Sequence, residues 1–322
     1  MSSHLKKFFP TLFLVFWIFY IYANEEPVND LYHFNYYLAN PAVAGANDCT
    51  YAMLGASFNW VGMEDAPMTQ LLAVQTRLQH GVGLGGYVFN DRNGYVLQQG
   101  LQFTVAYHIN LTENKYTFRT EKDRQLSFAV SGKVFNRSFS SDFIPQNPND
   151  PAYFDMSPFS VFNTNAGIYY VSYGFFTGLS AYNLIPMKMW DSSIDNTEPY
   201  MPMTFRFLIG NKFNIDAESI EPSIMCKANV NGAIDLDLNL KYAHEFESDN
   251  NSAWCLQASY RSSFETNAIY SKKIFAMAGF TLNKFHFGYS FGLDLNRLIY
   301  HNYGTHQLML GYTFCHVKRF CR

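Results

Sequence analysis

The sequence predicts an all-β protein, a transmembrane antiparallel β-barrel of about fourteen strands that follows a cleaved signal peptide. Three observations lead to this prediction. Apolar and polar residues alternate with a period of two over most of the chain, as in strands with one apolar and one polar face. Charged residues make up only 15%, whereas soluble domains carry about 25%. The 31 phenylalanines and 23 tyrosines suit the aromatic girdles of a barrel.

The first 23 residues are expected to be a signal peptide that is removed on export. A positively charged start, Lys6-Lys7, is followed by an apolar run from Phe8 to Tyr22 and then by the small residue Ala23. This is the order of regions in a secretory signal. The apolar run is shorter than the roughly 20 residues that a membrane-spanning helix needs, so a removed signal is favoured over a retained anchor.

The mature chain divides into residues 24–48 and residues 49–322. The first segment is too polar to span a bilayer, and we expect it to plug or skirt the periplasmic mouth of the barrel. The second carries the alternation, since in Ile234 to Tyr242 every even position is apolar and every odd position is polar. Most predicted strands have ten or more residues, the length that a tilted strand needs to cross a bilayer. They lie near 49–60, 67–78, 81–91, 95–110, 124–137, 159–171, 174–185, 202–214, 219–230, 233–247, 252–264, 268–283, 285–296 and 305–316.

The connections between these strands give an independent indication. In a barrel with a periplasmic N-terminus, the turns after even-numbered strands are short and those after odd-numbered strands are longer. Two connections depart from the rule, the long 111–123 and the tight turn Asn231-Gly232. Those that follow it are the short Gln79-His80, Ser172-Tyr173, 215–218 and Lys284, and the longer 138–158, 186–201 and 297–304.

Charge and motifs exclude several functions. The net charge of −3, without a cluster of Lys and Arg, argues against nucleic acid as a partner. The glycine-rich stretch 81–86 leads into a strand, whereas a phosphate-binding loop opens a helix, so its glycines are expected to accommodate bulky lumen neighbours or a bend. Asp235, Asp237 and Lys241 share one face and are assigned to a polar lumen rather than to acid–base chemistry. Neither Gly-x-Ser-x-Gly nor His-Glu-x-x-His occurs, so we predict no enzyme, no catalytic residue, no metal ligand and no cofactor.

The five cysteines are few, and their number is odd, which does not suggest a disulfide framework. Cys315 and Cys321 are separated by six residues of extended strand, roughly 20 Å, which exceeds disulfide reach. We expect all five, including Cys49, Cys226 and Cys255, to be mostly unpaired wall or end residues.

Several short sequence blocks occur in order over essentially the whole mature chain. They are Asn40 to Gly45, Trp60-Val61-Gly62 with Ala66-Pro67, Gly83 to Gly86 with Asn90 to Gly94, Ala106-Tyr107-His108, Gly178-Leu179-Ser180 with Asn183, Glu221-Pro222-Ser223 and Gly304 to Phe314. Together they resemble the PorP/SprF family of Bacteroidetes outer-membrane proteins. Two features depart from the family pattern: Gln307 stands where an acidic residue often follows the histidine, and the chain continues past Phe314 to Arg322.

The resemblance implies a component of the type IX secretion system in the bacterial outer membrane, linked in some members to gliding motility. Such a component aids the export or surface anchoring of a large secreted protein. The partners that it implies are other secretion-system components, a secreted adhesin or its C-terminal domain, and outer-membrane lipid. The resemblance implies no catalytic residues.

Two loops expected on the same extracellular rim are candidates for docking the exported protein, because rim loops vary without disturbing the wall. They contribute Trp60, Asp65 and Pro67 from the first loop, and Asp91 and Arg92 from the second. The same residues are also ordinary turn formers. Three other functions stay open: a channel or hydrophobic-substrate transporter with the same wall, an outer-membrane enzyme, and a soluble β-sandwich lectin or adhesin.

Overall fold

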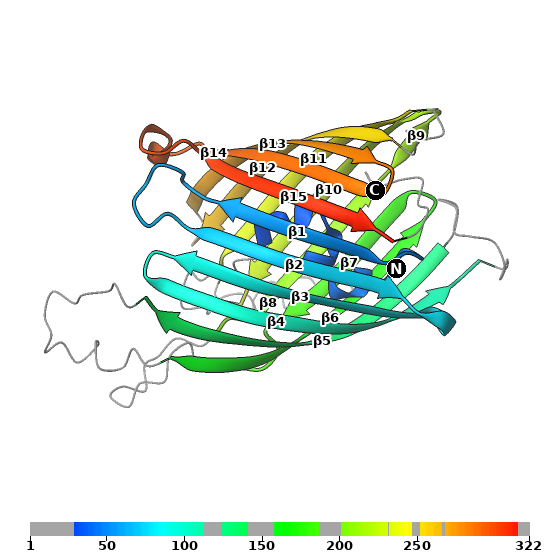
Figure 1. Ribbon diagram of the computed structural model, residues 1–322, viewed down its shortest axis with the longest axis horizontal. Coiled ribbons are helices and arrows are strands. Elements are labelled where there is room, and N and C mark those ends of the chain that lie inside the picture. Colours follow the sequence, from blue (N-terminus) through cyan, green and yellow to red (C-terminus); the bar gives the residue numbers. More distant parts are fainter. Residues whose placement is uncertain are drawn as a thin grey trace, which may run out of the picture.

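The structure is a closed antiparallel β-barrel that surrounds a short N-terminal segment (Figure 1). It is a computed structural model that describes residues 29–112, 124–140, 158–186, 201–230, 232–246, 252–265 and 268–314. The predicted signal peptide lies outside these residues. Within the described part of the chain, no helix is long and apolar enough to cross a membrane.

Fourteen strands close the barrel, which confirms the predicted fold class. Each strand pairs with its neighbours in the chain, and β15 returns to pair with β1, as in the register Tyr51 to Thr313. The strands are β1 (Tyr51–Phe58), β2 (Met68–Arg77), β3 (Val82–Asn93), β4 (Val96–Asn110), β5 (Arg124–Phe139), β6 (Phe159–Ser172), β7 (Phe175–Tyr182), β8 (Thr204–Asn211), β10 (Glu218–Asn229), β11 (Ile234–Glu245), β12 (Ala253–Glu265), β13 (Ala268–Leu282), β14 (Phe285–Asp294) and β15 (Thr305–Thr313).

One predicted strand, 202–214, is divided in the structure into β8 and a short β9 (Phe213–Ile215). The register that pairs β10 with β8 continues into β9, since Ser223 faces Gly210 and Ile220 faces Phe213. Pro222 lies between these two pairs and has no N–H to donate, so the ladder is interrupted there. Beyond β8, β9 pairs with β10 alone.

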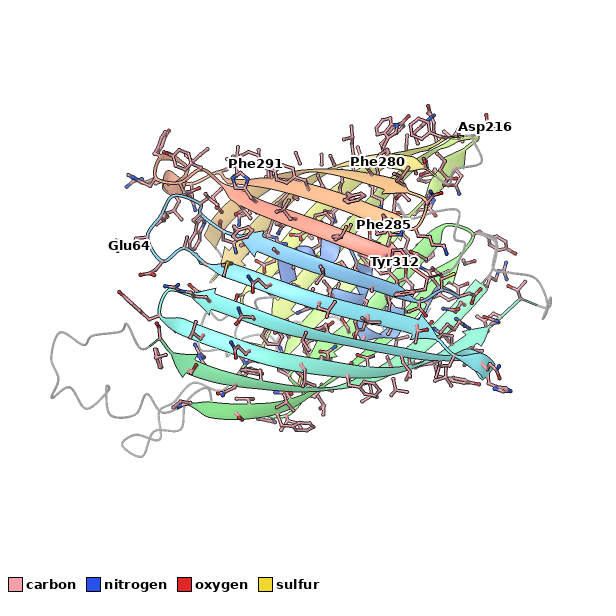
Figure 2. The ribbon with its side chains drawn as sticks, viewed as in Figure 1. Glu64, Asp216, Phe280, Phe285, Phe291 and Tyr312 are labelled. Carbon is pink, nitrogen blue, oxygen red and sulfur yellow. The ribbon has the colours of Figure 1, made fainter. Side chains whose placement is uncertain are left out.

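The wall has an apolar outer face and a polar inner face, as the alternation predicts. On β4, Leu101 and Phe103 are 52% and 54% exposed on the outside, whereas Gln102 and Thr104, between and beside them, are 2% and 0% exposed. Exposed apolar and aromatic side chains cover the outside of the wall, including Phe280 and Phe285, which are labelled in Figure 2. Such a surface matches lipid, which excludes charge and cannot satisfy polar groups.

The two ends of the barrel differ. The turn end, where β1 begins and β15 ends, includes the two-residue links 173–174 and 283–284. The loop end, at the other side, carries the longest connections, 140–158 and 183–203. The predicted asymmetry has the exceptions that the sequence indicated, and the loop end also contains the short link 266–267.

Residues 29–46, which we call the lumen segment, lie inside the barrel (Figure 1). They form three short 3-10 helices, η1 (Asn29–His33), η2 (Tyr36–Leu38) and η3 (Pro41–Val43). Two asparagine side chains start the second and third helices, because Asn35 accepts from Tyr37 N at 3.0 Å and Asn40 accepts from Ala42 N at 2.9 Å. Each asparagine therefore satisfies a main-chain N–H group at the start of its helix.

Hydrogen bonds fasten the lumen segment to strands all round the wall. Tyrosine hydroxyls of the segment donate to wall carboxylates, main-chain carbonyls of the segment accept from wall side chains, and one asparagine of the segment donates to a main-chain carbonyl of the wall. The bonds are Tyr32 Oη to Asp237 (2.6 Å), Tyr36 Oη to Glu221 (2.8 Å), Ser180 Oγ to Ala39 O (2.9 Å), Arg206 Nη1 to Leu38 O (2.9 Å), His108 Nε2 to Ala44 O (2.9 Å) and Asn40 Nδ2 to Ile168 O (2.9 Å).

Glycines in the wall make room for this segment. A Cβ at Gly83 would collide with the carbonyl of Ala44, and one at Gly85 would collide with the ring of Tyr37. A Cβ at Gly167 would likewise collide with Asn40 Oδ1. The glycine-rich stretch thus accommodates bulky lumen neighbours, and those neighbours come from the N-terminal segment.

Gly167→Ala is expected to weaken the docking of the lumen segment by about 1–3 kcal/mol, because the added methyl group displaces Asn40. Hydrogen–deuterium exchange of the amides of residues 36–43 measures this loss. The matched control is Gly132→Ala, where the new Cβ would meet only the ring edge of Phe162 at 3.7 Å. Equal exchange in the two variants would contradict the prediction.

The prediction for the cysteines is wrong at Cys49, which forms a disulfide. Cys226 and Cys255 are thiols, and Cys315 and Cys321 lie outside the described residues. The prediction considered only cysteines that are close in sequence. Closure of the barrel brings the start of β1 beside the end of β15, so partners distant in sequence come within reach.

Candidate functional site

Three connections at the loop end are joined into one ordered surface, which we call the rim platform: residues 59–67, 91–95 and 295–304. Val61 N donates to Gly304 O at 2.9 Å, and Tyr303 N donates to Val61 O at 2.7 Å. These two bonds join the first connection to the third like a short piece of β-ladder. Glu64 marks this end of the barrel in Figure 2, and Asp216 marks the opposite end.

Trp60 holds the first connection against β14. Its backbone has φ +52°, in the left-handed region, and its Nε1 donates to Asp294 Oδ2 at 2.9 Å. Lys273 Nζ lies 3.8 Å from Asp294 Oδ1, so a cation lies on the other side of the same carboxylate. The indole is half-buried, and it positions the loop as well as presenting an edge at the rim.

Asp65 and Arg92 join the first connection to the turn between β3 and β4. Arg92 Nη2 lies 2.6 Å from Asp65 Oδ1, and Arg92 Nε donates to Gly94 O at 3.2 Å. Gly94 N in turn donates to Asp65 O at 3.3 Å. Both charged side chains are partly exposed, at 43% for Arg92 and 30% for Asp65, so the pair is accessible from outside.

The other two candidates occupy different positions. Pro67 closes the loop through its carbonyl, which accepts from Asn59 N at 2.9 Å. Asp91 is 7% exposed and accepts from Thr69 Oγ1 at 2.7 Å, so it faces the lumen and does not share the surface of Asp65 and Arg92. The alternation along β3 explains this, because neighbouring residues of a strand face opposite sides.

The sequence predicted the third connection of the platform as a longer loop, 297–304, but it was not counted among the docking candidates. Its 3-10 helix η5 (Arg297–Tyr300) begins at Asn296, whose side chain accepts from Leu298 N at 2.9 Å. Tyr300 and Tyr303 are 85% and 76% exposed. Exposed tyrosines are frequent at protein interfaces. The two tyrosines in this predicted loop could therefore have indicated a docking surface from the sequence alone.

The lumen wall holds compact ion pairs beside the lumen segment. Arg261 donates twice to Asp237, at 2.7 and 2.8 Å, and the same carboxylate accepts from Tyr32. Lys241 Nζ lies 3.7 Å from Glu221, which accepts from Tyr36. Burial raises the pKa of the Tyr32 and Tyr36 hydroxyls well above the usual value, so both remain hydrogen-bond donors.

Tyr37 is the central aromatic residue of the lumen segment. Its side chain is fully buried, and burial raises the pKa of its hydroxyl to about 12. The hydroxyl shares a hydrogen bond of 2.9 Å with Thr104 Oγ1, and the ring lies edge-on to Tyr87, with centroids 6.1 Å apart. Tyr37 therefore packs against β3 and β4 in the interior of the barrel.

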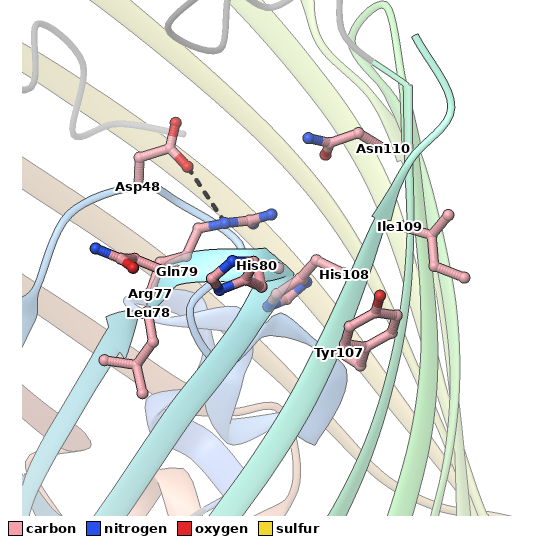
Figure 3. A pocket seen from close by; sticks show the side chains of 10 residues that line it. Asp48, Arg77, Leu78, Gln79, His80, Tyr107, His108, Ile109 and Asn110 are labelled. Atoms are coloured by element: carbon pink, nitrogen blue, oxygen red, sulfur yellow. Dashed lines mark ion pairs between the residues drawn. The ribbon is translucent and has the colours of Figure 1, made fainter. Parts of the chain in front are cut away.

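A pocket of about 600 Å³ lies at the turn end (Figure 3). Arg77 faces Asp48 across it at 3.5 Å and donates to Gln125 Oε1 at 3.1 Å. His108 lines it as well, but both ring nitrogens are engaged, Nε2 with Ala44 O and Nδ1 with Ser127 Oγ. These side chains hold the base of the lumen segment. Among the described residues no group of three or more His, Cys, Asp or Glu is arranged to hold a metal ion.

The lipid-facing wall, the polar lumen and the two distinct ends define the chain as an outer-membrane β-barrel protein. Its lumen contains its own N-terminal segment, and its loop end carries the rim platform. The chain belongs to the PorP/SprF family of type IX secretion system membrane proteins, whose family model matches residues 21–312.

The chain also aligns with solved structures, at TM-scores below 0.5. The CymD monoaromatic hydrocarbon channel aligns with a TM-score of 0.48 at 10% identity, over 85% of this chain and 90% of that one. A TodX monoaromatic hydrocarbon channel mutant has a TM-score of 0.46 at 10% identity, over 85% and 91%. BamA from Haemophilus ducreyi, lacking POTRA domains 1–3, has 0.40 at 9% identity, over 83% and 70%. Comparison with curated proteins gave no match.

Proposed function

We propose that this protein is a non-enzymatic docking component of the type IX secretion machinery, which helps to export a large secreted protein or to anchor it at the cell surface. Its family membership shows that it is a membrane protein of this secretion system. The loop end is assigned to the extracellular side, because outer-membrane barrels have short periplasmic turns and longer extracellular loops. The rim platform then faces the medium, where an exported protein emerges.

The observation that carries the proposal is the contrast between a filled lumen and an ordered, accessible rim. Leu31, Tyr37 and Ala42 of the lumen segment have no exposed surface, and their neighbours bond to the wall on several sides. The rim platform offers exposed tyrosines and a partly exposed ion pair on loops that are fixed by hydrogen bonds. A pre-ordered surface loses little conformational entropy on binding, which favours a docking role.

The partner suited to this surface is a folded domain, in our proposal the C-terminal domain of a secreted adhesin. Tyr300 and Tyr303 supply aromatic contact area, and Asp65 with Arg92 supplies polar contacts of both signs. Aromatic residues and arginine are the residue types that dominate interface energetics. Other secretion-system components are proposed to contact the turn end in the periplasm.

A channel is the second candidate, favoured by the barrel wall alone. A wall of this size can enclose a water-filled lumen. The lumen segment argues against it, since it crosses the interior and its hydrogen bonds hold it to both sides of the wall. Conductance in planar bilayers separates the two candidates, because only a channel conducts while its lumen segment is in place.

The docking role is tested by the double variant Trp60→Ala, Asp65→Ala in the native host. The readout is the surface level of those exported proteins that disappear from the cell surface when the barrel gene is deleted. We expect a drop of about tenfold or more, the size of effect produced by losing interface hot spots.

The matched control is Asp216→Asn, a polar tip residue at the opposite end of the barrel, with φ +51° that asparagine tolerates (Figure 2). Both variants must assemble in the outer membrane in normal amounts, which heat-modifiable gel migration checks. Normal surface display in the double variant would refute docking at this loop.

A further inference from the structure

Beneath the rim platform, three polar side chains on neighbouring strands are buried with no hydrogen-bond partner among the described residues. Gln307 on β15 is 0% exposed, and within the described part of the chain neither its Oε1 nor its Nε2 is hydrogen-bonded. Ser57 on β1 and Ser290 on β14 are 2% and 1% exposed, and their hydroxyls have no partner among the same residues. The register pairs both serines directly with Gln307, so the three form one row across the lumen wall.

Such a row is costly for the fold. Each buried polar group without a partner destabilises a protein by about 1–3 kcal/mol. Other buried lumen glutamines have at least one bonded amide atom: Gln102 accepts from Tyr87 at 2.9 Å and from Asn165 at 2.7 Å, and Gln257 donates to Ser259 at 2.9 Å. Folding alone therefore gives no reason for an amide at position 307.

The row has defined limits. Next to Ser57 lies Thr69, which already donates to Asp91 at 2.7 Å, and next to Ser290 lies the apolar Met277. No charged side chain belongs to the row. Its chemistry is neutral, with the acceptor and donors of one amide between two hydroxyls that can each donate or accept.

A peptide main chain has the neutral donors and acceptors that could pair with these side chains. A carboxamide presents one acceptor and two donors in a plane, which matches the C=O and N–H groups of an extended segment. The row also lies close to the mouth. Two residues nearer the loop end, Thr305 on β15 donates at 3.2 Å to Asn59, the residue that follows β1. A chain that enters from the rim platform meets this row next.

We propose that Gln307, flanked by Ser57 and Ser290, binds main-chain amide groups of an extended segment of the exported protein. This inference rests on the docking function proposed above and adds a recognition site inside the mouth. The row is closed to solvent, so the incoming segment reaches it by displacing the side chains that cover it.

The test uses the purified full-length barrel and, as probe, the isolated C-terminal domain of the exported protein that depends on the barrel for surface display. Gln307→Leu keeps the side-chain volume and removes both polar atoms. We expect the variant to bind the domain about tenfold or more weakly, the effect of losing one paired amide. We also expect it to unfold at the same temperature as the natural protein or a higher one, because a buried group without a partner has been removed.

Gln102→Leu is the matched control, since its amide is bonded in the structure. We expect lower thermal stability and unchanged affinity of the folded fraction. Unchanged affinity in Gln307→Leu would overturn the inference while leaving rim docking intact, and lower stability would show that Gln307 is structural. Failure of the domain to bind the natural barrel would refute the docking function and this inference with it.

Discussion

Deletion of residues 29–46 is expected to convert a closed barrel into a conducting pore. The lumen segment fills the interior of the barrel around Leu31, Tyr37 and Ala44, which have no exposed surface. The wall that it covers is polar, for example at Thr104 and Ser127 on β4 and β5. A polar wall freed of its contents takes up water, and a barrel of about fourteen strands is wide enough to conduct ions.

Single-channel recording in planar bilayers measures this effect. We expect stepwise conductance in the deletion variant and none of comparable size in the natural protein. A triple variant, Tyr32→Phe, Tyr36→Phe and Tyr37→Phe, is the matched control, because it keeps the three rings and removes only their hydroxyl hydrogen bonds. It is expected to remain closed for most of the time.

Two results would contradict this account. A deletion variant that folds and stays closed would show that the lumen segment is not the seal. A natural protein that already conducts as well as the deletion variant would favour the channel over the docking component.

Replacement of Arg261 by leucine is expected to destabilise the barrel by roughly 3–5 kcal/mol, the cost of leaving a buried charge without its partner. Arg261 forms both of its short hydrogen bonds to Asp237, whose side chain is only 4% exposed. Without the guanidinium, Tyr32 Oη at 2.6 Å remains as a neutral donor to that carboxylate. Urea unfolding in detergent micelles, followed by gel migration without heating, measures the change.

The pair Arg92 and Asp65 provides the control at a solvent-exposed site. These side chains lie 2.6 Å apart and are 43% and 30% exposed, so Arg92→Leu is expected to cost about 1 kcal/mol or less of stability. The double variant Arg261→Leu, Asp237→Leu should recover most of the lost stability, because apolar residues replace a buried ion pair with little net cost. If the double variant were as unstable as the single one, lost packing of Arg261 rather than the unpaired charge would be the cause.

Much of the wall is predictable from the sequence. Every strand of the barrel was located to within a few residues. Each strand has one face toward lipid and one toward a polar interior, so apolar and polar residues alternate in its sequence. Lumen positions such as Asp237 and Lys241 follow from the same period of two. The split of β8 from β9 could also have been foreseen, since Pro222 cannot donate to the ladder.

The rim was predicted less completely. Asp65 and Arg92 were placed together from their loops, and the structure shows them as an ion pair. Asp91 was grouped with them, although its strand parity turns it into the lumen. Tyr300 and Tyr303 were missed, because only closure between β1 and β15 brings their loop beside Val61.

The sequence by itself thus determined the class of fold, the strands and the face of each residue, since these depend on local periodicity and on the contrast between lipid and water. Tertiary structure decided what fills and joins the barrel. The path of residues 29–46 through the lumen, the disulfide of Cys49 and the buried row at Gln307 all depend on which distant strands become neighbours when the wall closes. Contacts of that kind are set by the three-dimensional arrangement of the whole barrel, which no local pattern encodes.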